Sequence, residues 1–237
     1  MKIQKNRVGV WILVMVILAF SVWLIGSKIE QNYKTTSLTN QHIDKTTFQK
    51  IRENVSNTAQ AALPEWLAKI SKVNIRDFGF QSYEDISRAT LAPPIPVLSP
   101  DRDADKQAIE KSIEERRPDY WLVPIVVNDR ITCFLSVNST DSEQPRVTGL
   151  NGKSYRGNRI ESVLRSFDES ISSYQENLYI LIFYEPDTDF LLTRKSDEQW
   201  KWFDFGGING DGPVTPLNEN TLSETLMGIK NQKPLRR

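Results

Sequence analysis

The stretch YWLVPIVVNDRITCFLSV, residues 120–137, decides the fold of this chain. Tyr120–Val127 is the clearest strand signal, because two sets of apolar residues alternate along it with a period of two. Asn128-Asp129 predicts a tight turn, and Ile131–Val137 supplies the returning strand. We therefore expect an antiparallel hairpin at this point of the chain.

The spacing of apolar residues predicts further elements on both sides of the hairpin. Strands are expected at Arg146–Leu150, Tyr179–Tyr184, Phe190–Arg194 and Trp200–Phe205. Helices are expected at Asp44–Leu63, Pro64–Ser71, Ala104–Arg116 and Asn218–Ile229, around Ile160–Ile171, and after Ser82, where Asp85 reaches back as in a capping box. Ile95–Leu98 is predicted to be an edge strand, the position where a proline does least harm.

Grouped strands with short turns pair antiparallel, which indicates the α+β class. We expect a mainly helical region at 44–119 and an antiparallel α+β region at 120–237, with strand meanders and packed helices. The order strand, strand, strand, helix occurs twice in the second region and suggests two similar units, 120–172 and 177–229. This layout resembles small exported α+β modules of the PepSY or cystatin-like type, and no motif assigns the chain to a family.

Val8–Ser27 is a run of twenty residues without a charge, apolar on all sides. Twenty helical residues span roughly 30 Å, the thickness of the hydrocarbon core of a bilayer. A cleaved signal peptide is the alternative to an uncleaved anchor. The nearest small-x-small site, Ala19-Phe20-Ser21, lies inside the apolar run, so we favour a transmembrane signal anchor.

The charges that flank this segment predict its orientation. Lys2, Lys5 and Arg7 precede it, which places residues 1–7 in the cytoplasm and the large domain outside. Residues 28–43 are polar and predict a stalk. The chain is therefore expected to be a single-pass protein of the cell membrane with an extracytoplasmic domain.

Composition excludes several classes of function. The chain has 237 residues, with 30 basic and 30 acidic side chains, and a nucleic-acid binder would show a basic surplus. Its one cysteine, Cys133, permits no intrachain disulfide, which fits a bacterial envelope protein better than a cysteine-rich ectodomain. We interpret Cys133 as a small buried hydrophobic residue of a strand.

The single histidine, His42, lies in the predicted stalk. Ser-His-Asp and Cys-His catalysis need an imidazole inside a formed site, and a zinc site needs three or four His or Cys ligands. No catalytic residue, metal site or cofactor is therefore predicted. A calcium site in the loop Gly206–Gly212 is disfavoured, because the carboxylates expected at its first and twelfth positions are missing.

The most suggestive segment is Trp200–Phe205 with the glycine-rich loop Gly206–Gly212 that follows it. A strand with large aromatic residues on both faces is either enclosed in a core or presents one face as a contact surface. The candidate binding residues are Trp200, Trp202, Asp204, Asn209 and Asp211.

Two hypotheses of function follow. In the first, the outer domain is a non-catalytic binding or regulatory module for an envelope protein or another envelope component. In the second, it is a carboxylate-based, glycosidase-like hydrolase of an envelope polymer, in which acids converge beside exposed tryptophans. The acids considered are Asp187, Asp189, Asp204 and Asp211.

Overall fold

The structure is a computed structural model. It describes residues 42–139, 144–152, 155–167, 170–171, 174, 177–183, 188–194, 199–205 and 216–231. None of the helices in these ranges is long and apolar enough to cross a membrane, and the predicted anchor, Val8–Ser27, lies outside them.

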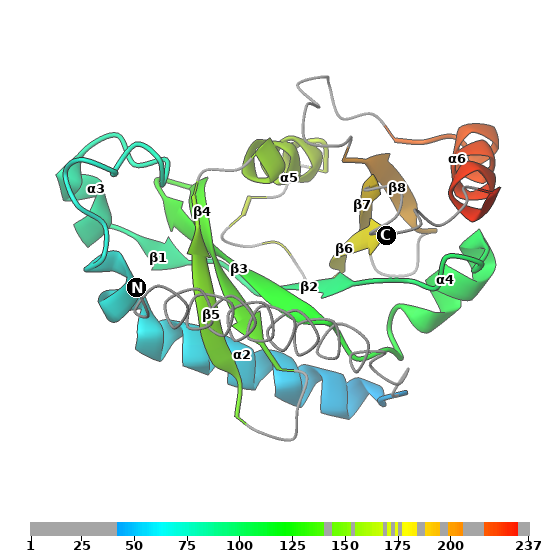
Figure 1. The fold of residues 1–237 in the computed structure, drawn as a ribbon, viewed down its shortest axis with the longest axis horizontal. Coiled ribbons are helices and arrows are strands. Elements are labelled where there is room, and N and C mark those ends of the chain that lie inside the picture. The colour runs from blue at the N-terminus through cyan, green and yellow to red at the C-terminus, as the bar shows by residue number, and fades with distance from the viewer. Residues whose placement is uncertain are drawn as a thin grey trace, which may run out of the picture. The chain divides into compact units, whose positions relative to one another are not determined.

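A mixed sheet of eight strands organises the described residues (Figure 1). Its main path runs in the order β5-β4-β3-β2-β6-β7-β8, and the short strand β1 pairs beside β3. The strands are β1 (Thr90–Leu91), β2 (Ile95–Leu98), β3 (Tyr120–Val127), β4 (Arg130–Asn138), β5 (Arg146–Asn151), β6 (Leu178–Phe183), β7 (Thr188–Thr193) and β8 (Lys201–Asp204). The prediction of an α+β fold is thereby confirmed.

The predicted hairpin is present as β3 and β4. Asn128 and Asp129 form its turn in left-handed conformations, with φ of 52° and 58°. Two successive residues of this kind match the twist of the flanking strands, which is why Asn and Asp are favoured there. Trp121 and Val123 face one core of the domain and Leu122 faces the other, as the alternation of apolar residues indicates.

Strand β2 occupies the centre of the sheet, so the prediction of an edge strand was wrong. It pairs antiparallel with β3 and parallel with β6, and it joins the two meanders β3-β4-β5 and β6-β7-β8. Pairing with β6 involves only Val97 and Leu98, past the proline at position 96 that lacks an N–H donor. The expectation of purely antiparallel pairing missed this parallel contact.

A double proline separates β1 from β2, although both strands pair along β3. The carbonyl groups of Pro93 and Pro94 are satisfied by side chains rather than by a neighbouring strand. Arg52 donates to the Pro94 carbonyl (3.2 Å), and the Tyr174 hydroxyl donates to that of Pro93. Both side chains are buried, and burial raises the pKa of Tyr174 while the nearby Arg52 opposes that shift.

Helices cover both faces of the sheet. Those on the first face are α2 (Lys45–Leu67), α4 (Lys106–Ser112) and α6 (Glu219–Asn231). The second face is covered by α5 (Tyr155–Arg165), and the short helix α3 (Tyr83–Ser87) precedes β1. Figure 1 shows α2 beside β3, β4 and β5, with α4 and α6 at the β6-β7-β8 end. The helices that follow the two meanders therefore lie on opposite faces, and the similarity of units 120–172 and 177–229 stays a prediction.

Side-chain caps explain where several helices begin. Asp44 accepts the Thr47 N–H before α2, and Asp105 accepts the Ala108 N–H before α4. Both are standard N-cap bonds to the third residue of a helix. The expected break at Pro64 is absent, because α2 continues through it to Leu67 and loses only one hydrogen bond near its end.

The described chain begins at His42, which is exposed and lies 3.6 Å from a carboxylate oxygen of Glu115. Ile43 directly after it is buried in the core. The segment is anchored by a hydrogen bond from the Ile43 N–H to the Glu115 carbonyl (2.7 Å).

The contact of Arg52 with the Pro94 carbonyl predicts a large effect of an Arg52 substitution on stability. Replacing it by methionine removes the donor to the Pro94 carbonyl, so we expect Arg52→Met to lower the free energy of unfolding by about 2–3 kcal/mol. For Tyr174→Phe we expect a loss of about 1–2 kcal/mol. Urea unfolding of the full chain in detergent, followed by tryptophan fluorescence, measures both.

Tyr83→Phe is the matched control, because that tyrosine is 50% exposed. It should leave the unfolding midpoint unchanged. Equal midpoints for Tyr174→Phe and Tyr83→Phe would contradict the role assigned to the buried hydroxyl.

Candidate functional site

A hollow among the described residues lies between α4, α6 and the segment that enters β8. It has a volume of about 790 Å³ and is lined by Trp200, which gives it the name Trp200 groove used below. Its walls carry charged side chains of both signs and two apolar side chains of α6, Leu226 and Met227. Its volume lies within the range of ligand-binding clefts, but most of its lining residues are polar, whereas those of a typical cleft are mostly apolar.

Trp200 forms an apolar, half-buried surface of the groove. The Tyr179 ring meets it edge-on, with centroids 5.5 Å apart. The guanidinium of Arg194 lies over its ring at 4.5 Å and is also paired with Glu114. A ring held between a neighbouring aromatic and a cation has little freedom, so the orientation of the Trp200 ring is restricted.

Trp202 shares the face of Trp200 but has a different role. It is 2% exposed, and its ring packs edge-on against Phe190. Its indole N–H donates to a carboxylate oxygen of Glu110 at 2.8 Å, and Glu110 lines the groove. Trp202 therefore supports the wall of the groove from within the core.

Two polar links hold α6 against the segment that contains α4. Lys106 pairs with Glu219 at 2.8 Å, and Arg102 donates to the Ile229 carbonyl at 2.9 Å. The hydrogen bond between Lys106 and Glu219 raises the pKa of Lys106 and lowers the pKa of Glu219. The pair is therefore ionised at neutral pH, and its contribution to stability is lost in acid below the ordinary pKa of a Glu or in strong base.

Met227 is the residue that sequence reasoning missed. It is 56% exposed on α6, whose buried side chains Leu222, Leu226 and Ile229 form the stripe that faces the core. An apolar residue outside the apolar stripe of an amphipathic helix was the available signal. Met227 thereby adds an exposed apolar side chain to the lining of the groove.

The remaining candidate residues do not join this groove. Asp204 is exposed on the face of Trp202 and does not line the groove. Asn209 and Asp211, with the whole loop Gly206–Gly212, lie outside the described residues. Of the five candidates, the structure therefore assigns Trp200 to the groove and Trp202 to its support.

The acids considered for hydrolysis are not gathered where the structure describes them. Asp189 is buried and belongs to the face of Leu191, whereas Asp204 belongs to the opposite face, with Trp202. Asp187, like Asp211, lies outside the described residues.

Three of the four acids that line the groove are engaged in structural contacts. Glu110 accepts the Trp202 N–H, Asp105 caps α4, and Glu219 holds Lys106. A general acid needs a carboxyl whose pKa is raised, whereas the pKa of Glu219 is lowered.

Metal and thiol chemistry find no site in the described ranges. No group of three or more His, Cys, Asp or Glu side chains there is placed to hold a metal ion. Cys133 is fully buried, and burial raises the pKa of its thiol to about 12. Because the thiolate is the reactive form, Cys133 is an inert core residue at neutral pH, as predicted from its strand.

Comparison of the chain with protein-family models, with curated proteins and with solved structures finds no match.

The different placement of the two tryptophans predicts different effects on stability. Trp202→Phe removes a partly buried hydrogen bond and part of a buried ring, so we expect it to lower the free energy of unfolding by about 2–3 kcal/mol. Trp200→Phe keeps a ring in the groove and should cost less than about 1 kcal/mol. Thermal unfolding of the two variants side by side measures the difference, and a larger effect at Trp200 would reverse the assigned roles.

Proposed function

We propose that this chain is a single-pass membrane protein whose extracytoplasmic α+β domain is a non-catalytic binding module for another envelope protein. In this proposal Val8–Ser27 is the membrane anchor and the Trp200 groove is the contact site. The observation that carries the binding role is the pairing of an aromatic ring of restricted orientation, Trp200, with an exposed methionine, Met227, across one groove.

The composition of the groove supports a protein partner. Tryptophan, methionine and arginine are enriched in the centres of protein interfaces, where rigid aromatic rings act as anchors. Methionine adapts its shape to different apolar surfaces. These features favour a partner segment that inserts an apolar side chain between Trp200 and Met227.

Two charged residues at the rim of the groove further restrict the kind of partner that would fit. Asp103 and Lys230 line the groove, are exposed and form no ion pair with another described residue. Because their charges are opposite, they favour a partner segment that carries both signs rather than a strongly basic or acidic one.

Photo-crosslinking in native membranes tests this role. A photoreactive amino acid at position 227 should give one discrete product with an envelope protein, and Trp200→Ala should remove it. Truncation of an aromatic anchor typically costs about 2 kcal/mol or more, which is about a thirtyfold loss of affinity.

The control position is Val73, which is 95% exposed and does not line the groove. The same photoreactive residue at position 73 should not give the product. A product that forms equally from both positions, or that survives Trp200→Ala in a folded protein, would contradict the proposed contact site.

The proposed orientation in the membrane has an independent test. The test is possible because the native cysteine, Cys133, is buried and should not react with a labelling reagent. In intact cells, a membrane-impermeant maleimide should label Val73→Cys, because the domain is placed outside. Lys5→Cys should be labelled only after permeabilisation, and the native chain should stay unlabelled in both conditions. Labelling of Lys5→Cys in intact cells would overturn the orientation.

A further inference from the structure

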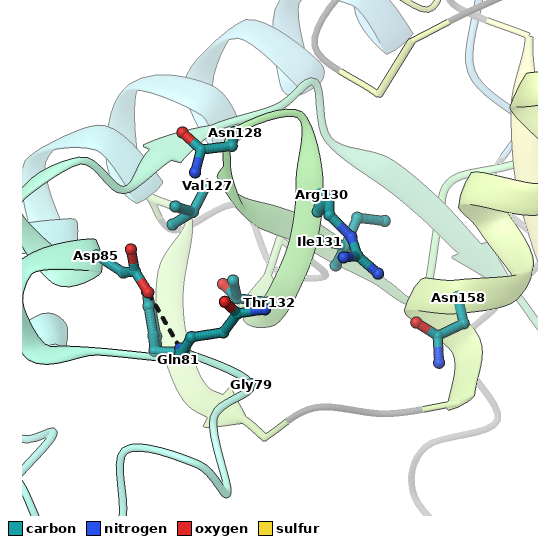
Figure 2. Close-up of a pocket in the computed structure, with 10 residues that line it drawn as sticks. Gly79, Gln81, Asp85, Val127, Asn128, Arg130, Ile131, Thr132 and Asn158 are labelled. Carbon is teal, nitrogen blue, oxygen red and sulfur yellow. Dashed lines mark hydrogen bonds between the residues drawn. The ribbon is translucent and has the colours of Figure 1, made fainter.

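A second pocket lies away from the Trp200 groove, at the tip of the β3–β4 hairpin (Figure 2). It has a volume of about 280 Å³ and is enclosed by the loop before α3, the hairpin turn and the first turns of α5. We call it the hairpin pocket. The left-handed turn at Asn128 and Asp129 sets the directions in which Asn128 and Arg130 leave the hairpin.

Four exposed polar side chains line this pocket. Among the described residues, the side chains of Gln81, Asn128, Arg130 and Asn158 form no hydrogen bond or ion pair with one another or with other groups. They come from three separate segments of the chain, and Figure 2 shows Gln81 near Thr132, Arg130 extending toward the side of Asn158, and Asn128 apart from them at the hairpin turn. Three of them are carboxamides, each of which offers a donor and an acceptor.

The pocket also contains Asp85, but that carboxylate is fully engaged. It accepts the N–H groups of Gln81 (3.1 Å) and Ser82 (2.9 Å) and pairs with Arg88 at 2.5 Å. These bonds, above all the one from Ser82, hold the pKa of Asp85 below its ordinary value. Arg88 balances Asp85, whereas Arg130 forms no ion pair with another described residue.

Apolar side chains contribute the rest of the lining. Phe80, Val127 and Ile131 are buried residues of the two cores, so the apolar wall of the pocket is held in place by core packing. A rigid apolar base with a few convergent polar groups is the usual construction of a small-molecule site. The volume lies just below the roughly 300–1,000 Å³ of sites for drug-sized ligands, which limits the occupant to a smaller molecule.

We propose that the hairpin pocket binds a small hydroxylated carboxylate of the sugar-acid class. The planar fork of Arg130 matches the two oxygens of a carboxylate. The carboxamides of Gln81, Asn128 and Asn158 match hydroxyl groups, which likewise both donate and accept. The uncharged sugar lacks the group that Arg130 recognises and binds more weakly.

Saturation-transfer NMR on the full chain in detergent tests this site, with D-glucuronate as the probe and D-glucose as its neutral counterpart. We expect saturable binding of glucuronate and at least about tenfold weaker binding of glucose, because a charge-assisted hydrogen bond contributes about 1.5–3 kcal/mol. Arg130→Met should weaken the binding of glucuronate by a similar factor.

Arg76→Met is the matched control, because Arg76 is an exposed arginine that does not line the pocket. It should leave glucuronate binding unchanged, and circular dichroism should show both variants folded. Absence of glucuronate binding, equal binding of glucose, or equal loss in both arginine variants would overturn the proposal. Position 227 does not line the hairpin pocket, so the photo-crosslinking result does not depend on glucuronate binding. A negative result in one experiment therefore leaves the other proposal unaffected.

Discussion

The interaction on which the rest of the structure depends is the satisfaction of the Pro93 and Pro94 carbonyls by Arg52 and Tyr174. Two adjacent prolines interrupt a strand, and their buried carbonyl groups would be costly without partners. Once the two side chains supply those partners, the chain re-enters the sheet as β2, the strand that holds both meanders together. Because β2 lies at the centre of the sheet, the helices that cover the two faces pack on either side of it.

The two recesses lie at different places on this framework. One face of the sheet carries α2 at one end and the short helices α4 and α6 at the other. Because α4 and α6 are joined by polar links around Lys106 and Arg102, a space lined by Trp200 remains between them. The hairpin pocket forms at the opposite end of the first meander, where β3 and β4 pass the loop before α3.

Local signals predicted local structure well. The alternation in Tyr120–Val127 and the turn at Asn128 led to the correct hairpin, because both are properties of adjacent residues. The central position of β2 could not be predicted, since Pro96 locally favours an edge and pairing with β6 depends on residues far away in the sequence. In the site, Trp200 was found from composition, whereas Glu110 and Met227 join it only through the packing of distant helices.

The parallel seam between β2 and β6 also has a consequence for the order of assembly. Pairing within β3-β4-β5 is local, whereas Val97 has to meet Ile180 across a long intervening segment, and long-range closure is slow. During synthesis the first meander can close on β1 and β2 before β6 has left the ribosome. Until then Val97 and Leu98 present an open apolar edge, so the nascent domain is most exposed to aggregation in that interval.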